Sequence, residues 1–232
     1  MTILRIHLVP RKRDLVLVHI EGQEPLEIAL DVMDRSGIHV GTELEPVDLA
    51  RLKEDDAKWR VRQAALHLLS YRPRAEQELR TRLKAKAHPP ALVEWCIHLL
   101  REKGFLDDEA FSSAYARSHI RLRPRGRFRL MQELRQKGVP GTVADKAIAD
   151  AFIEEETSEE ILATEVAEQW VERQNRAVAE ALATNERSLE RERGRRRLHA
   201  FLSRRGFAPE AVRAALAAAL DKAAHLCVSD AL

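Results

Sequence analysis

The 232-residue chain has few cysteines, few aromatic residues and no long apolar run, and each shortage excludes a class of protein. Cys96 and Cys227 stand far apart without a metal-binding spacing, which argues against a disulfide framework and against a zinc knuckle. Aromatic residues make up 5% of the chain, too few for a typical β-sandwich or β-barrel core. No stretch approaches the roughly 18 apolar residues of a membrane span, and the N-terminus lacks a signal-peptide pattern. We therefore expect a cytoplasmic protein that does not enter a membrane.

The sequence patterns of common catalytic and cofactor sites are also missing. There is no GxxxxGK(S/T) phosphate loop, no GxGxxG and no HExxH, and the nine histidines are scattered without metal-ligand spacing. The adjacent carboxylates Asp107 and Asp108 precede an apolar helical pattern, so we interpret them as capping groups of a helix. We expect no catalytic residue, no cofactor, no metal site and no enzyme activity.

Charge is plentiful and is grouped in blocks. The net charge is only +2, but residues 117–137 hold eight basic residues and one acidic one. Residues 145–172 reverse this with ten acidic residues and one basic one, and residues 191–205 hold seven basic residues and one acidic one. Such blocks create local electric fields even when the total charge is small.

One helical pattern occurs three times. A basic amphipathic helix is followed by a short break and a second apolar helix, and the anchors of the second and third copies are offset by 68 residues, as in Leu130 and Leu198. The first copy, starting at Leu79, lies 51 residues before the second. Repeated segments at fixed offsets are typical of a repeat protein, in which stacked units share one continuous core.

The fold prediction follows from these repeats and from the first 45 residues, where short apolar runs alternate and are separated by turn residues. We predict a mainly α protein, an elongated tandem array of three three-helix repeats preceded by a small β-containing region. That region should hold a sheet of two or three strands, packed on the helices, and a short helix over about residues 30–36 that stops at Gly37. The predicted boundaries are 1–45 for the β region and 46–106, 107–156 and 157–232 for the repeats.

Two further details concern the helices themselves. A helix over residues 48–70 is predicted to break near Asp55 and Asp56. The third repeat is predicted to begin with one long helix over residues 158–193, because no glycine or proline occurs before Gly194.

The candidate partner-binding residues are arginines that gather near the turns. Guanidinium groups bind phosphate in a forked geometry, so a nucleic-acid backbone is one possible ligand. Tyr115 and Phe128 fit the apolar stripe, so stacking of bases on exposed rings is not expected. The candidate contacts are Arg72, Arg74, Arg117, Arg121, Arg123, Arg125, Arg127, Arg129, Arg195, Arg196, Arg204 and Arg205.

Two other interpretations use the same arginines. They can form a solvated helical face paired with acidic neighbours such as residues 154–172. They can also dock on an acidic protein surface.

Several segments, taken together, resemble the RecX family of regulators of the RecA recombinase. The order and spacing of these segments carry the resemblance, which covers nearly the whole chain. Ala75 and Ser112 depart from the usual family pattern. The similar segments are residues 38–44, 65–79, 103–111, 126–139 and 204–212.

The resemblance implies a protein that binds the RecA filament on DNA and restrains its ATPase activity, growth and strand exchange, although some relatives stimulate RecA. Such a protein would act in homologous recombination, DNA repair and the SOS response. It would be a monomer that contacts more than one RecA protomer, with direct contact to single- or double-stranded DNA as a further possibility. One alternative is a sequence-independent nucleic-acid-binding repeat protein that acts without RecA, and another is a helical scaffold with a different partner.

Overall fold

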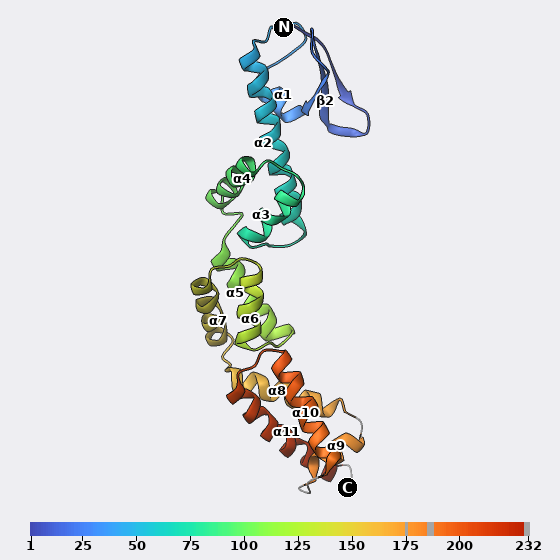
Figure 1. Cartoon of the computed structure of the whole chain (residues 1–232), viewed down its shortest axis with the longest axis vertical. Helices are drawn as coiled ribbons and strands as arrows, with labels where there is room; N and C mark the ends of the chain where they lie inside the picture. The colour runs from blue at the N-terminus through green and yellow to red at the C-terminus, as the bar shows by residue number, and fades with distance from the viewer. Residues whose placement is uncertain (175, 185–187, 230–232) are drawn as a thin grey trace. The chain divides into compact units, whose positions relative to one another are not determined.

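A computed structural model describes residues 1–174, 176–184 and 188–229, in which helices predominate and one small sheet lies in the N-terminal region (Figure 1). The chain divides into two compact units, Met1–Leu106 and Asp107–Leu232. The predicted mainly α class with a small N-terminal sheet is confirmed. Within the described part of the chain, no helix combines the length and the apolar character that crossing a bilayer requires.

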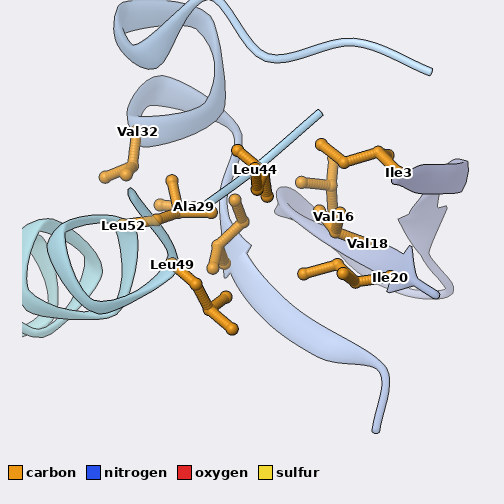
Figure 2. Packing of buried hydrophobic residues seen from close by; sticks show 10 residues of the cluster. Ile3, Val16, Val18, Ile20, Ala29, Val32, Leu44, Leu49 and Leu52 are labelled. Carbon is orange, nitrogen blue, oxygen red and sulfur yellow. The ribbon is translucent and has the colours of Figure 1, made fainter. Parts of the chain in front are cut away.

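The sheet of the first unit has three antiparallel strands in the order β1-β2-β3. Its inner face is apolar because every second residue of β2 points to the core, and Val16 and Val18 are fully buried there. Figure 2 shows Leu49 and Leu52 of the following long helix in the same cluster. The short helix α1 ends at Gly37, as predicted, and the φ of Gly37 is 66°, in the left-handed region. The elements are β1 (Ile3–Val9), β2 (Lys12–Ile20), β3 (Leu26–Ala29) and α1 (Leu30–Ser36).

Helix α2 (Pro46–Tyr71) belongs to two apolar cores. The expected break near Asp55 is absent, and the helix runs unbroken through it. The reason is that Asp56 is buried and satisfied: its carboxylate accepts hydrogen bonds from the backbone N–H of Ala29 at 2.7 Å and from Arg60 at 2.6 Å. Asp56, which was predicted to interrupt the helix, instead connects the sheet to the helix through these hydrogen bonds.

The second half of α2 forms the first repeat with α3 (Glu76–Ala85) and α4 (Pro90–Glu102). Gly104 follows α4 with a φ of 71°, a conformation that favours glycine. Its backbone N–H donates to the carbonyl of Arg101, as expected for a helix that stops there.

The second unit contains seven helices in its described residues. Asp107 caps the first of them, because its side chain accepts hydrogen bonds from the backbone N–H groups of Glu109 and Ala110. The capping interpretation of this carboxylate is therefore confirmed. The helices are α5 (Asp108–Leu122), α6 (Arg127–Gln136), α7 (Gly141–Glu154), α8 (Glu159–Glu172), α9 (Arg176–Ala183), α10 (Leu189–Arg204) and α11 (Pro209–Ser229).

The leucine anchors of the three repeats occupy equivalent buried positions. Leu79, Leu130 and Leu198 are each at most 1% exposed. The leucines four residues later, one helical turn away, are fully buried as well: Leu83, Leu134 and Leu202. The spacing of i and i+4 places each pair on one helix face, as the repeat pattern requires.

The single long helix predicted over residues 158–193 is wrong. Helix α8 ends at Glu172, and α9 and α10 are separate helices, with Ser188 capping α10 through a hydrogen bond to the N–H of Arg191. The residues that lengthen the third repeat therefore follow its first helix, and they include α9. Leu182 of α9 is buried and packs against Gly194, where a Cβ would lie 3.0 Å from the leucine side chain. Glycine at this place lets the inserted helix dock.

The second and third repeats meet through two glycines. A Cβ on Gly126 would lie 2.2 Å from the carbonyl oxygen of Gly206, so the two backbones approach more closely than any side chain allows. The N–H of Gly126 donates to the carbonyl of Arg205 at 2.9 Å, and the N–H of Phe128 donates to that of Gly206. Buried Glu159 adds one carboxylate oxygen that accepts from the backbone N–H groups of Arg127 and Ala208, both at 3.0 Å.

We expect Gly126→Ala to lower the free energy of unfolding by about 1–3 kcal/mol, because backbone atoms of Gly206 must move to admit the methyl group. Urea denaturation followed by circular dichroism measures this. Gly141→Ala is the matched control, since its added Cβ would meet only the flexible side chain of Arg135 at 3.4 Å. Equal stability of the two variants would contradict the close-contact account.

Candidate functional site

The basic corner between α5 and α6 is partly neutralised by the acidic block that follows it. Arg117 pairs with Glu154 at 2.6 Å and Arg121 pairs with Glu155 at 2.5 Å. Arg127 lies 3.8 Å from Glu159 and over the ring of Phe152. For these three candidate arginines, the interpretation of a helical face paired with its acidic neighbours is confirmed.

Buried Glu133 on α6 is the acceptor for three side chains. Arg125 and Arg129 form ion pairs with it, and the hydroxyl of Tyr115 donates to it at 2.8 Å. Burial alone would raise the pKa of Glu133, but the Tyr115 and Arg129 hydrogen bonds and the charge of Arg125 outweigh it and hold the pKa below 4.5. Burial, followed by the hydrogen bond to Glu133, raises the pKa of Tyr115 to about 12. The Tyr115 side chain is therefore held within the protein and is not a free surface on which a base could stack.

The two candidate arginines of the first repeat are also paired locally. Arg72 contacts Glu78 at 2.5 Å, and Arg74 contacts the same carboxylate while its Nε donates to the carbonyl of Leu68. The Arg74 side chain is only 9% exposed, which leaves little of it for a partner.

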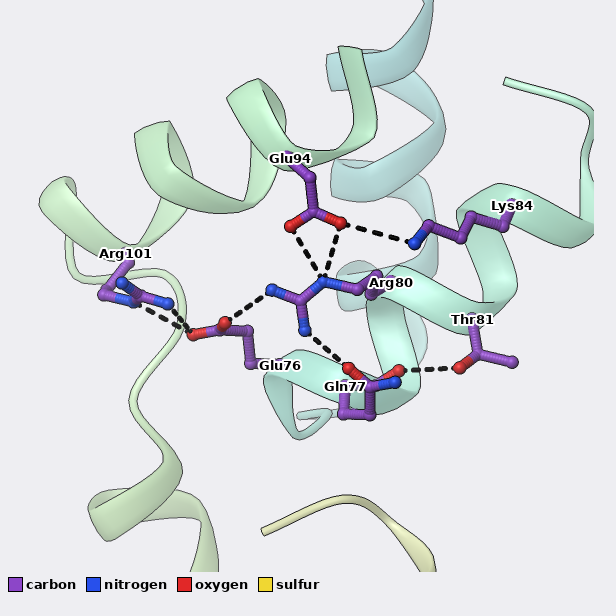
Figure 3. Close-up of polar contacts among 7 residues, drawn as sticks. All are labelled: Glu76, Gln77, Arg80, Thr81, Lys84, Glu94 and Arg101. Atoms are coloured by element: carbon purple, nitrogen blue, oxygen red, sulfur yellow. Dashed lines mark hydrogen bonds and ion pairs between the residues drawn. The ribbon is translucent and has the colours of Figure 1, made fainter. Parts of the chain in front are cut away.

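Figure 3 shows a neighbouring network of the same kind in this repeat, between α3 and α4. There Glu76 receives hydrogen bonds from Arg80 and Arg101, and Arg80 also contacts Glu94. Oppositely charged side chains of the two helices thus satisfy one another across this packing.

The candidate arginines of the third repeat differ in how far they are neutralised. Arg195 and Arg196 lie 3.3 Å and 4.0 Å from Glu192. Arg204 is exposed and forms no ion pair with any described residue. Arg205 is half-buried, and its guanidinium donates to the backbone carbonyl of Pro124 at 3.0 Å.

Four arginines line one cavity of about 500 Å³ in the second unit. They are Arg123 and Arg125 of the α5–α6 loop, Arg173 at the end of α8 and Arg205 at the end of α10, with Gln169 beside them. None of the described residues that line this cavity, hereafter the arginine pocket, carries a negative charge. Burial and the charges of Arg125 and Arg173 lower the pKa of Arg205, which indicates that like charges crowd the site.

A second hollow, of about 340 Å³, contains aromatic rings as well as arginines. Trp170 and Phe201 have ring centroids 6.4 Å apart, and the guanidinium of Arg197 lies 6.0 Å from the Trp170 ring. Arg205 lies 4.6 Å from the Phe201 ring. We name this hollow, with Arg196 and Arg204 also on its wall, the aromatic hollow.

Sequence reasoning missed Arg173, Trp170 and Phe201 as surface groups of this region. The offset of 51 residues between the first two repeats is the signal that could have found them. Counted from the end of α5, this offset predicts a helix end near Arg173. The long helix predicted in its place hid that end. Phe128 is also misplaced by the apolar-stripe prediction, because its side chain is 65% exposed.

A hollow of about 550 Å³ in the first unit has a different character. It is lined by Trp59 and Trp95 but carries both charge signs, for example Arg51 beside Asp55, so no single charge is favoured there. Among the residues that the structure describes, no cluster of three or more His, Cys, Asp and Glu side chains could hold a metal ion.

We expect Glu133→Gln to lower the free energy of unfolding by about 1–3 kcal/mol at pH 7, because two guanidiniums lose a buried partner. Since the folded-state pKa of Glu133 is lowered, its contribution is present above pH 4.5 and is lost as the pH falls through the folded-state pKa. Urea denaturation at pH values from 7 to 3 measures this. The difference in free energy of unfolding between the variant and the wild-type protein should become smaller in acid. The exposed ion-pair variant Glu154→Gln should cost less than about 1 kcal/mol, and a Glu133→Gln effect that does not change with pH would contradict the assignment.

Two family models match the chain over its first two repeats. Residues 62–100 match the RecX first three-helix domain, and residues 107–148 match the RecX second three-helix domain. The first matched segment covers the end of α2 with α3 and α4, and the second covers α5, α6 and the first half of α7.

Relatives and solved structures extend the similarity beyond these domains. The chain is 36% identical over 159 residues to Regulatory protein RecX of Halorhodospira halophila, covering 68% of this chain and 88% of the relative. It is 30% identical over 161 residues to that of Halalkalibacterium halodurans, of which the match spans 58%. A crystal structure of regulatory protein RecX has a TM-score of 0.63 at 24% identity and covers 92% of this chain and 98% of that one. RecX from Lactobacillus salivarius has a TM-score of 0.55 at 18% identity, covering 72% and 98%. With its domain matches, its relatives and its fold in agreement, the chain belongs to the RecX family of regulatory proteins.

Proposed function

We propose that this protein binds the RecA filament on DNA and inhibits its ATPase activity, growth and strand exchange. The observation that carries the proposal is the 36% identity to a RecX regulatory protein over 88% of that protein's length. The protein acts as a monomer in the cytoplasm, without catalytic chemistry of its own.

The second unit supplies a surface that suits this role. Arg123, Arg173 and Arg204 are exposed and have no ion pair among the described side chains, so their charges remain available to a partner. A RecA–DNA filament offers both acidic protein groups and phosphates. Contacts spread over several repeats add affinity without a deep pocket, because each bound unit raises the effective concentration of the next.

We expect the protein to lower the rate of ATP hydrolysis by RecA on single-stranded DNA in a concentration-dependent way. Physical association should appear as co-sedimentation with the assembled filament. Absence of both effects would refute the proposal, whereas co-sedimentation with a raised rate would refute inhibition and retain regulation. Bovine serum albumin at equal concentration controls for crowding.

A second candidate function is direct binding of nucleic acid without RecA. The arginine pocket and the aromatic hollow favour it, because together they present guanidiniums for phosphates and rings for bases. Binding of a fluorescein-labelled single-stranded oligonucleotide, measured by anisotropy, should weaken steeply as salt rises, since each neutralised phosphate releases counterions. Binding that does not depend on salt would argue against it.

A further inference from the structure

We propose that the arginine pocket binds a phosphodiester group of a single-stranded nucleic acid and that the neighbouring aromatic hollow holds a base of the same strand. The inference rests on the second candidate function, which it narrows to a defined site and a defined ligand. It does not depend on binding to RecA.

The charge of the pocket selects an anion. Arg125 is compensated by Glu133, whereas Arg205 donates only to a neutral backbone carbonyl. Arg123 and Arg173 form no ion pair with the residues that the structure describes. An oxyanion that enters between these groups relieves their mutual repulsion and accepts their N–H donors in the forked geometry that guanidinium provides.

The pocket is formed before a ligand arrives, because the contact between repeats holds its walls in place. The hydrogen bond from Gly126 N–H to the Arg205 carbonyl joins the α5–α6 loop to the end of α10. The Arg205 guanidinium is oriented by the Pro124 carbonyl and by the ring of Phe201. Side chains that are already ordered lose little conformational entropy on binding, which increases affinity.

The aromatic hollow adjoins the pocket. Gln169 lines the pocket and Trp170 lines the hollow, and likewise Arg205 lines the first and Arg204 the second. The Phe201 ring against Arg205 joins the two sites. Guanidiniums that hold the backbone beside rings that stack with bases are the components of a single-strand binding surface.

This combination separates a single strand from the other anionic partners. A carboxylate-rich protein surface would satisfy the guanidiniums but would leave the aromatic hollow unused. A duplex keeps its bases stacked inside, so they are not available to Trp170 or Phe201. The geometry therefore favours an unpaired strand over both.

The first test removes two charges from the pocket. In Arg123→Gln/Arg173→Gln, neither change orphans a described carboxylate, so the fold should persist. We expect at least tenfold weaker binding of a labelled oligothymidine to the full chain without RecA. The slope of log K against log salt should be smaller by about 0.7 for each phosphate that the variant no longer neutralises.

The control for this test is Arg117→Gln/Arg213→Gln, which removes the same charge from exposed guanidiniums that are already paired with exposed Glu154 and Glu210. Its affinity for the oligothymidine should stay within twofold of the original. Equally weakened binding in both variants, or unchanged binding in the first, would overturn the assignment.

The second test identifies the ligand. Trp59→Phe/Trp95→Phe leaves Trp170 as the sole tryptophan of the chain. Oligothymidine should quench its fluorescence, and an abasic oligonucleotide of equal length should bind with much less quenching. Quenching or competition by inorganic phosphate at the same phosphate concentration would indicate a free-anion site. Displacement of the strand by polyglutamate at equal charge would indicate an acidic protein partner. Either result would overturn the strand proposal.

The RecA assay distinguishes this inference from the proposed regulation. A pocket variant that no longer binds the oligonucleotide, while the original chain fails to affect RecA, supports the pocket and refutes the RecA proposal. An original chain that binds no oligonucleotide overturns the pocket assignment, whatever the RecA ATPase shows.

Discussion

The contact between Gly126 and Gly206 is the constraint on which the second unit depends. Two helix ends meet there backbone to backbone, at a distance that no side chain would permit. Buried Glu159 supports the same contact by accepting hydrogen bonds from an N–H group on either side of it. Because Arg205 directly precedes one of these glycines and Arg125 the other, the contact that joins two repeats also brings their arginines together.

About half of the arginines in the described residues form ion pairs with the chain's own carboxylates. Arg117, Arg121 and Arg72 each contact a glutamate within 2.6 Å, so their charges are largely neutralised within the protein. Of these pairs, only that of Arg117 with Glu154 joins two exposed side chains, and such a pair contributes little to folding free energy. In contrast, Arg123, Arg173 and Arg205 form no ion pair with a described residue, and all three line one cavity.

The two units build and stabilise their small apolar cores in different ways. In the first, α2 lends one half to the sheet and the other half to the first repeat, so neither core stands alone. Asp56 reinforces this sharing through its hydrogen bond from Ala29. In the second, α9 is inserted after the first helix of the third repeat, and Gly194 leaves room for Leu182. Because the insertion lies before α10, it leaves the spacing of the leucine anchors within that helix unchanged.

The sequence by itself determined the features that depend on local chemistry. Leu130 and Leu198 predicted equivalent helices, Gly37 predicted a helix end, and Asp107 predicted a cap, since each acts within one or two turns of its own position. Only the tertiary structure decided which carboxylate each arginine meets and which four arginines line one cavity. Arg205 and Pro124 are 81 residues apart, and Arg173 lines the pocket from the end of α8. The periodicity of apolar residues indicates which residues share one face of a helix. A pocket formed where two repeats meet depends on tertiary packing, which no local sequence pattern encodes.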